Sequence, residues 1–294
     1  MTEIRPPFGT YALPGILEQL RVSASSFPKN RLGRLAVSVA RKICLLSGRN
    51  PVDVEIYPTI RARVYPGSNR CEKRILAGPQ FFDLPERRFL TEAVEVGDRS
   101  ETFRFLDLGA NVGMYSLWVI AETRRIGRPV KVVAVEPDKI TGARLRTNIA
   151  ASDASDLIDV ASCGVGGKAG KARMIEDTNN RGGNHIDLVQ SDDADDDVFV
   201  VATIPEICDA HGLKKLDALK IDVEGYDYDA LDGLFKSKRF DLFPTWIQAE
   251  IGRDNQESEL VRLCEANGYR SVTRTKLNII MQQSGDLAAG DERI

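Results

Sequence analysis

The chain has only five cysteines, and no two of them are close in sequence. An odd number of widely spaced cysteines does not suit the disulfide framework of a small secreted protein, and it is typical of reduced thiols. The first residues also lack the basic segment followed by an apolar segment that marks a secretory signal peptide. We therefore expect a cytoplasmic protein without structural disulfides.

Long apolar runs are missing as well. The longest uncharged run of interest, residues 108–121, has 14 residues and contains two glycines. A membrane-spanning helix needs about 20 predominantly apolar residues. We therefore expect no transmembrane segment. The hydrophobic content of 43% and the charged content of 28% are those of an ordinary globular protein.

The protein has no strong excess of charge of either sign. Its net charge of −3 argues against wholesale coating of nucleic acid. The distribution is uneven, because residues 1–100 hold 16 Lys and Arg against 10 Asp and Glu, whereas the remainder holds 24 against 33. The basic N-terminal part is either a solvated face or a surface that meets an anionic partner or substrate, and the sequence leaves both open.

The N-terminal 100 residues are expected to form an α+β extension. Residues 1–30 hold four of the thirteen prolines and show little periodicity, so we expect a loose arm. A helix is predicted over residues 31–47, where apolar side chains recur at helical spacing. They are Leu32, Leu35, Val39, Ile43 and Leu46. We expect this stripe to pack against the main domain, and a peripheral helix on a membrane surface is the alternative.

From residue 101 to residue 294, strands and helices are expected to alternate, which predicts an α/β domain with a mostly parallel sheet. Strands are expected near 103–108, 130–136, 158–163, 217–222 and 245–251, and helices near 113–124, 138–150, 226–236 and 256–267. The last two strand-like runs, 269–274 and 277–282, predict an antiparallel edge pair. Shorter strands near 171–176 and 198–203 flank a polar insertion.

The densest motif is a buried strand followed by a turn with Asp107, Gly109, Asn111 and Gly113. Gly109 lets the chain turn without a Cβ clash, and Gly113 is expected to let the next helix approach the sheet. The free N–H groups at that helix start face a ligand, and Asp107 adds a carboxylate to the same crevice. This combination suits a cationic, amino-acid-like ligand such as S-adenosylmethionine.

The next strand ends in a second carboxylate, Glu136. A Glu at this position can accept hydrogen bonds from both ribose hydroxyls of a nucleoside. The rival interpretation is a dinucleotide-binding turn, which normally carries a glycine where this chain has Asn111. The pattern therefore favours S-adenosylmethionine as the cofactor.

A third strand ends with Lys220, Asp222 and Glu224 at alternate positions, so the three side chains are expected on one side of the sheet. Glu250 ends a further strand at the same edge. Ligands of open α/β sheets bind at this edge, which would hold carboxylates from four strands. A buried carboxylate without a partner is costly, so either a cationic ligand or a local Lys or Arg must be present.

The segments around Asp107–Gly113, Val135–Pro137, Asn180–Asn184 and Lys220–Gly225 together resemble the FkbM-like family of S-adenosylmethionine-dependent methyltransferases over roughly residues 100–285. The resemblance implies a class I methyltransferase (Rossmann-like) fold and methyl transfer to a hydroxyl of a sugar, glycan or natural product. It also implies that Asp107, Gly109, Asn111 and Gly113 hold the methionine part of the cofactor, that Glu136 holds the ribose, and that Asp222 and Glu224 lie at the reaction crevice.

An aliphatic hydroxyl needs a base before it attacks a methyl group. The candidates are Asp222, Glu250 and His185, the last within a glycine-rich loop; the second histidine, His211, is expected to be structural. Asp222 and Glu250 could instead bind a divalent cation that acidifies the hydroxyl.

Two other functions remain open in the sequence. Lys220, Asp222 and Lys276 are compatible with RNA 2′-O-methylation, although the acidic catalytic half and the lack of basic-aromatic clusters argue against nucleic acid. N-methylation is disfavoured because an Asn-Pro-Pro-Tyr motif is missing. A non-catalytic module that binds the cofactor and a partner is the second alternative.

Overall fold

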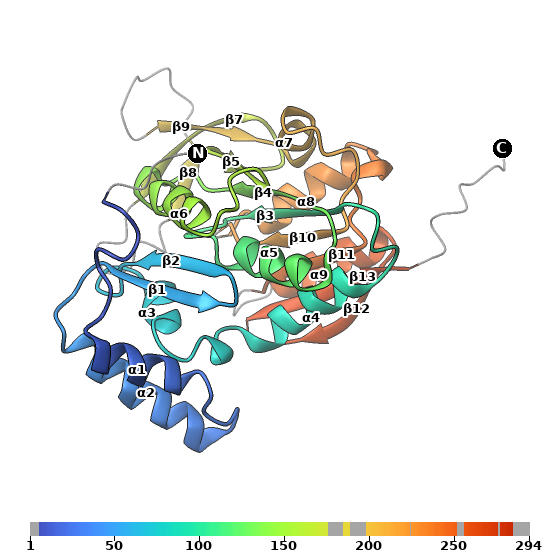
Figure 1. The fold of residues 1–294 in the computed structure, drawn as a ribbon. Coiled ribbons are helices and arrows are strands. Elements are labelled where there is room, and N and C mark those ends of the chain that lie inside the picture. The colour runs from blue at the N-terminus through green and yellow to red at the C-terminus, as the bar shows by residue number, and fades with distance from the viewer. Residues whose placement is uncertain are drawn as a thin grey trace, which may run out of the picture.

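A seven-stranded sheet runs through the centre of the molecule in the computed structural model (Figure 1). The structure describes residues 6–175, 185–188, 198–223, 225–251, 256–275 and 277–284. The strand order is β12-β13-β11-β10-β3-β4-β5. The parallel strands are β3 (Phe103–Leu108), β4 (Val130–Val135), β5 (Ile158–Ala161), β10 (Ala218–Ile221) and β11 (Trp246–Glu250).

The C-terminal strands β12 (Tyr269–Arg274) and β13 (Asn278–Gln283) form the antiparallel edge that the sequence predicts. β13 pairs with β11, and β12 is the outer strand. The chain builds β3, β4 and β5 in one direction from the middle of the sheet and then returns to add β10 and β11 on the other side of β3. This reversal beside β3 leaves a crevice at the carboxyl ends of the strands.

Helices cover both faces of the sheet, as Figure 1 shows. Alternate residues along each strand enter different cores. Phe103 and Phe105 face one core with helices α4 (Leu84–Glu95), α5 (Met114–Ile126) and α6 (Lys139–Ala151). Leu106 and Leu108 face the other core, with α7 (Ile204–Ala210), α8 (Asp227–Lys236) and α9 (Gln256–Ala266). The predicted α/β class I methyltransferase-like architecture is therefore confirmed.

A smaller sheet lies beside the carboxyl ends of the main strands. It has the order β6-β9-β7-β8. Its strands are β6 (Gly164–Val165), β7 (Gly170–Ile175), β8 (His185–Leu188) and β9 (Val198–Ala202). The two strands predicted to flank the polar insertion are thus present, and β8 lies between them in the chain. The acidic run 192–197 lies outside the described residues.

The N-terminal extension contains more regular structure than expected. Its elements are α1 (Gly15–Ala24), α2 (Arg31–Leu45), β1 (Val52–Tyr57), β2 (Ile60–Val64), α3 (Arg70–Ile75) and the 3₁₀ turn η1 (Pro79–Phe81). The expectation of a loose arm over residues 1–30 is wrong for α1, which packs against α2 and is fixed by an Arg21 Nη1–Glu55 carbonyl hydrogen bond of 3.0 Å. β1 and β2 pair antiparallel, and their buried side chains join the core that contains β3 and α5.

The predicted helix over residues 31–47 is present as α2, but the expected orientation is wrong. The residues that α2 buries are Gly33, Val37, Ala40 and Cys44. The predicted stripe is exposed instead, from Leu32 to Leu46. The reason is geometric, since a Cβ on Gly33 would lie 1.9 Å from the Pro28 carbonyl oxygen and one on Gly78 would lie 2.1 Å from Val37 Cγ1. Contacts this close leave room for small side chains only.

All five cysteines are free in the structure, which agrees with the expected lack of a disulfide framework. None of the helices in the described ranges combines the length and hydrophobicity that a membrane span requires.

Candidate active site

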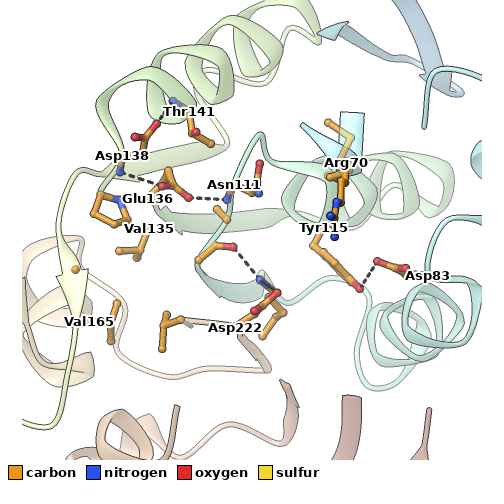
Figure 2. Close-up of a pocket in the computed structure, with 18 of the residues that line it drawn as sticks. Arg70, Asp83, Asn111, Tyr115, Val135, Glu136, Asp138, Thr141, Val165 and Asp222 are labelled. Carbon is orange, nitrogen blue, oxygen red and sulfur yellow. Dashed lines mark hydrogen bonds and ion pairs between the residues drawn. The ribbon is translucent and has the colours of Figure 1, made fainter. Parts of the chain in front are cut away.

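A cavity of about 230 Å³ lies at the carboxyl ends of β3, β4 and β10 (Figure 2). Its lining comes from five segments of the chain. They are the turn after β3 with the start of α5, residues 135–141 after β4, residues 163–165 after β5, the end of β10 from Lys220 to Val223, and residues 70–83 of the N-terminal extension. The first, second and fourth of these segments carry the motifs that the sequence singles out.

The turn after β3 depends on backbone conformations that favour glycine. Gly109 has φ +73°, and a Cβ there would lie 1.9 Å from the carbonyl oxygen of Asp222. This oxygen cannot move easily, because the Asp222 N–H donates a hydrogen bond of 3.1 Å to the Leu108 carbonyl. Gly109 therefore lets the two central motifs touch through their backbones.

Gly113 precedes α5 with φ +87°, a conformation that L side chains rarely adopt. A Cβ there would lie 2.5 Å from Leu145 Cδ1, which belongs to α6. The close approach that Gly113 permits is therefore to a neighbouring helix, whereas the sequence suggested an approach to the sheet. Gly113 does not line the cavity, but Gly109 and Asn111 do.

Asn111 takes the left-handed conformation with φ +51°. Its Oδ1 accepts hydrogen bonds of 2.9 Å from the Val112 N–H and from Nδ2 of Asn69, a buried residue of the N-terminal extension. The Asn111 side chain thus satisfies a backbone N–H group of its own turn and connects the turn to the N-terminal extension by a hydrogen bond. Short polar side chains such as Asn tolerate this conformation best among non-glycine residues.

Glu136 lies at the end of β4 and holds the turn in place. One carboxylate oxygen accepts from the Asn111 N–H at 2.9 Å, and the other accepts from the Asp138 N–H at 3.0 Å. Burial raises the pKa of Glu136 to about 7, against the opposing effect of these two N–H groups. The carboxyl group therefore titrates near neutral pH while it faces the cavity.

Asp138 begins α6 and caps it, because its Oδ1 accepts from the Thr141 N–H at 2.5 Å. Thr141 also lines the cavity, and its Oγ1 is buried without a hydrogen-bond partner among the described residues. Neither residue was singled out in the sequence, although an Asp three positions before Thr141 is a typical helix-start signal. Within the described ranges, the Thr141 hydroxyl is therefore an unsatisfied polar group in the buried part of the cavity wall.

Lys220 lies between two of the predicted carboxylates. Its Nζ is 3.4 Å from Asp222 Oδ2 and 3.8 Å from Asp107 Oδ1. It also donates to the Gly109 carbonyl oxygen at 2.8 Å. Burial lowers the pKa of Lys220, but the nearby Asp222 and Asp107 outweigh it, so the net shift is upward and the ammonium stays charged.

The two carboxylates beside Lys220 differ in access. Asp107 is fully buried beneath the cavity, and its Oδ2 accepts from both the N–H and the hydroxyl of Ser116, at 3.1 and 2.6 Å. Its pKa is raised, mainly by desolvation. The Asp222 side chain is 40% exposed and lines the cavity. A local lysine therefore compensates the carboxylates, which was one of the two possibilities that the sequence left open.

The wall opposite Glu136 comes from the N-terminal extension. Figure 2 shows Arg70 above Tyr115 and the Tyr115 hydroxyl pointing to Asp83. The Tyr115 hydroxyl donates to Asp83 Oδ2 at 3.2 Å, and Arg74 pairs with Asp83 Oδ1 at 2.9 Å. Sequence reasoning missed this wall, since α3 is too short to show periodicity. The available signal was Asn69 three positions before Glu72, because Asn69 caps α3.

The other predicted catalytic residues do not line this cavity or are only partly described. Glu250 ends β11, one position beyond the Ile221–Ala249 pair, so the register puts it at the same sheet edge as Asp222. It is not part of the cavity lining. His185 begins β8 in the smaller sheet, where its backbone pairs with Ile175. The His185 side chain and the whole of Glu224 lie outside what the structure describes.

The part of the chain that the structure describes holds no group of three or more His, Cys, Asp and Glu residues that could bind an ion. Asp222 is paired with Lys220, and a divalent cation between Asp222 and Glu250 stays a hypothesis. His211, expected to be structural, lies 3.6 Å from Asp159 through its Nδ1, outside the cavity.

Comparison with known proteins identifies the family. Three solved structures are similar in part. They are the methyltransferase FkbM from Methylobacillus flagellatus KT (17% identity, TM-score 0.41, 72% of this chain and 54% of that chain), the precorrin-6y C5,15-methyltransferase from Geobacter metallireducens GS-15 (13%, 0.41, 68% and 87%), and the O-methyltransferase from Bacillus cereus in complex with SAH (14%, 0.40, 67% and 79%). The chain spans about half the length of the first.

No curated protein gives a significant match to the chain. The sequence model described as the methyltransferase FkbM domain matches residues 107–271, which is more than half of the chain. The match begins at Asp107 and includes the glycine turn, Glu136, Lys220 and Asp222, which are the residues that meet around the cavity. The chain therefore belongs to the FkbM methyltransferase family.

Proposed function

We propose that the protein transfers a methyl group from S-adenosylmethionine to a hydroxyl oxygen of a sugar, glycan or natural-product acceptor, with Asp222 as the base. One observation carries the proposal. Asp222 reaches the open cavity with a side chain that is 40% exposed, while Asp107 and Lys220 on the same side are buried and both Glu136 oxygens accept backbone N–H groups.

The residues around the cavity fit the cofactor. Each oxygen of Glu136 accepts one backbone N–H, and an ionised carboxylate oxygen has a second lone pair for a ribose hydroxyl. The unpaired Thr141 hydroxyl adjoins this position. With both carboxylates ionised, Asp107, Lys220 and Asp222 carry one net negative charge, which favours a cationic ligand.

The motif residues divide into contacting and supporting roles in this proposal. Gly109 and Asn111 line the space for the methionine part, and Gly113 shapes the helix start that follows. Asp107 acts from beneath, through Lys220 and Ser116, because its carboxylate is buried. Glu136 is the residue that contacts the ribose.

The sulfonium of S-adenosylmethionine supplies an activated methyl group, so the protein must orient the acceptor and remove its proton. Asp222 would accept the proton of the acceptor hydroxyl as the methyl group leaves the sulfonium sulfur, which becomes a neutral thioether, and bonds to the hydroxyl oxygen. Lys220 holds the Asp222 carboxylate in position through the 3.4 Å ion pair. Tyr115, whose ring lies 5.6 Å from Lys220 Nζ, closes this side of the site.

The mouth of the cavity supports a polar acceptor. Arg70, Arg74, Asp83 and the Tyr115 hydroxyl offer both donors and acceptors of hydrogen bonds. Vicinal hydroxyls of a sugar can pair with such alternating groups, whereas an apolar substrate would remove water from them without offering a hydrogen bond.

Calorimetric titration with S-adenosylmethionine tests the cofactor assignment. A hydrogen bond to a charged group contributes about 1.5–3 kcal/mol. Glu136→Gln should therefore weaken binding about ten- to a hundredfold. Wild-type affinity should fall as the pH drops below about 7, since the protonated carboxyl loses acceptor capacity. Glu92→Gln, at an exposed position, is the matched control. Tight NAD binding without S-adenosylmethionine binding contradicts the assignment.

Methyl transfer to a panel of sugars, lipid-linked glycans, polyketides and RNA tests the reaction. Asp222→Asn keeps the shape and removes the base, so turnover should fall about 10²–10⁴-fold while cofactor affinity stays nearly unchanged. Asp156→Asn, an exposed carboxylate, is the control. Full activity of Asp222→Asn on a true acceptor would reject Asp222 as the base, and Glu250 and His185 would be the next candidates.

The same assay separates the base from a metal-ligand role. If Asp222 and Glu250 hold a divalent cation, the wild-type enzyme loses activity in chelator and regains it with magnesium or manganese. Activity that is insensitive to chelator supports direct proton transfer to Asp222.

A further inference from the structure

The helical hairpin of α1 and α2 has its large apolar side chains on the outside. Leu46 is 84% exposed, Leu32 78% and Ile16 77%. The other exposed members of this face, which we call the hairpin face, are Val22, Leu35, Val39 and Ile43. The hairpin interior is built instead from small residues, with Ala24, Val37 and Ala40 in a separate cluster. Exposed apolar surface of this extent on neighbouring helices is typical of an interaction site.

The hairpin also carries five exposed cations, of which Arg34 lies over the Phe81 ring and not beside the hairpin face. Lys29, Arg31, Arg34, Lys42 and Arg49 are all exposed. The only acidic residue between positions 6 and 51 is Glu18. It is bound to Arg21 through hydrogen bonds of 2.6 and 2.8 Å. The surface therefore combines apolar side chains with positive charge that no carboxylate of the hairpin neutralises.

The hairpin lies at one end of the molecule, below β1 and β2 and away from the seven-stranded sheet (Figure 1). This position leaves the hairpin face accessible to a large flat partner. On α2 the apolar residues and the cations occupy adjacent sectors of one exposed surface, since Arg31 and Lys42 follow Leu35 and Leu46 around the helix. Helices with this layout insert their apolar face into the headgroup region while Lys and Arg contact anionic lipids.

We propose that the hairpin face docks the protein onto an anionic lipid surface. Charge complementarity selects this occupant. A second copy of the chain placed by a two-fold axis would bring Arg31 and Lys42 of both copies to the same interface, which is repulsive. An anionic bilayer instead attracts them, at about a fivefold gain in partitioning for each Lys or Arg near the surface.

Docking would bring the cavity close to the lipid surface, because the hairpin packs on the segment that forms the cavity wall. Arg41 donates to the Ala77 carbonyl oxygen at 3.3 Å, and Gln80 Nε2 donates to the Ala24 carbonyl oxygen at 2.8 Å. The same segment continues into Phe82 and Asp83, which line the cavity. This inference concerns residues outside the proposed active site and stands whether or not the acceptor assignment holds.

Co-sedimentation of the full-length protein with vesicles tests the proposal. The protein should bind vesicles of phosphatidylcholine with phosphatidylserine, bind vesicles of phosphatidylcholine alone much more weakly, and dissociate from the anionic vesicles as salt is raised. Absence of binding to anionic vesicles at low salt overturns the proposal. S-adenosylmethionine titration and circular dichroism establish that each variant is folded.

Two sets of variants separate the apolar and the electrostatic contributions. Leu32→Gln/Leu35→Gln/Val39→Gln changes exposed positions only and should abolish binding. Arg31→Gln/Lys42→Gln/Arg49→Gln should lower binding about a hundredfold, from about fivefold per charge. Val272→Gln, an exposed apolar position on β12, is the control and should bind like wild type.

Unchanged lipid binding of the triple variant Leu32→Gln/Leu35→Gln/Val39→Gln overturns the proposal. The proposal is also overturned if the wild-type protein is a dimer that does not bind vesicles and the same triple variant is a monomer. The hairpin face would then be a contact between copies of the chain.

Discussion

Gly109 joins two motifs that are far apart in the sequence. Its missing side chain allows the turn after β3 to approach the carbonyl oxygen of Asp222 at the end of β10. The same turn is held by Glu136 from β4 through the Asn111 N–H. The positions of the proposed cofactor-binding turn and of the proposed base are thus coupled by a backbone contact that leaves no room for a Cβ atom.

Replacing Gly109 by Ala should lower the free energy of unfolding by more than the strain of a positive φ alone, because the added Cβ would also clash with the Asp222 carbonyl oxygen. Gly127, with φ +70° and nothing within 4 Å of an added Cβ, is the matched control. Gly127→Ala should lower the free energy of unfolding by about 1–2 kcal/mol, from strain alone. Gly109→Ala should lose about 1–3 kcal/mol more, because Asp222 must move. Denaturant unfolding measures both, and equal losses would show that the contact with Asp222 is not tight.

The residue types of the site could be predicted well where the signal is local. Gly109, Asn111 and Glu136 follow hydrophobic strands directly, and the alternation of Lys220 and Asp222 gave their common side. The ion pair of Lys220 with Asp107 could not be predicted, because it joins residues from different strands. The burial of Asp107 could not be predicted either, because its contacts are with Ser116 of α5 and Lys220 of β10.

At the scale of elements, α3 is fixed to the main domain by one buried ion pair. Arg144 of α6 donates to Glu72 Oε2 at 2.8 Å, and Tyr65 N–H donates to Oε1 at 3.1 Å. Glu72 is fully buried. Arg144 also lies over the Tyr65 ring at 4.0 Å and reaches Ser68 Oγ at 3.1 Å. The cavity wall is therefore attached to the helix that begins beside Glu136.

Arg144→Gln should destabilise the protein in a pH-dependent way. Burial raises the pKa of Glu72 to about 7 even though the Arg144 guanidinium lowers it. Removing the guanidinium should therefore raise the pKa of Glu72 further. A folded carboxyl with a raised pKa holds a proton that the unfolded chain releases above about pH 4.3, so stability falls as the pH rises through this window. The loss should be small near pH 4 and reach about 3–5 kcal/mol in alkaline solution.

Urea unfolding across pH measures this effect. Arg146→Gln, at an exposed position one half-turn along α6, should change stability by less than about 0.5 kcal/mol. Adding Glu72→Gln to Arg144→Gln should remove the pH dependence. A loss that is constant across pH would contradict the assignment to Glu72.

The elements of the sheet could be predicted because each strand is a run of apolar or β-branched residues between turn signals. The N-terminal elements could be predicted less well. The apolar stripe of α2 has helical spacing, but the choice of buried face depends on Gly33 and Gly78 fitting against Pro28 and Val37, which are tertiary contacts. α1 and α3 are short, and their hydrogen bonds to β1 and to the turn after β3 hold them in place.

At the scale of the whole molecule, the N-terminal extension and the main domain share one hydrophobic core across the predicted boundary near residue 100. One hydrophobic core contains Val54 and Ile60 from the extension together with Phe105 and Leu117 from the main domain. Tyr57 and Trp118, one from each part, pack edge to face with ring centroids 4.7 Å apart. Both parts therefore contribute side chains to the same core.

The protein should therefore unfold in a single cooperative transition. Ile60→Ala, at a fully buried position of β2, should lower the free energy of unfolding by about 2–5 kcal/mol and shift the whole transition. Val133→Ala, in the sheet and facing the other core, should shift the same single transition. Differential scanning calorimetry measures both, and a separate low-temperature transition that responds only to Ile60→Ala would show independent unfolding of the extension.

The cavity wall formed by residues 70–83 lies before the first residue of the family match, Asp107. The segment that matches the family model thus carries the proposed cofactor-binding residues and the proposed base, while part of the wall that the proposed acceptor would meet is encoded upstream of it. A change within this upstream segment leaves the matched range of the family model unaltered. Relatives recognised by that signature alone are therefore expected to share a methyl donor and to diverge in what they methylate, and their N-terminal sequences are the place to read the difference.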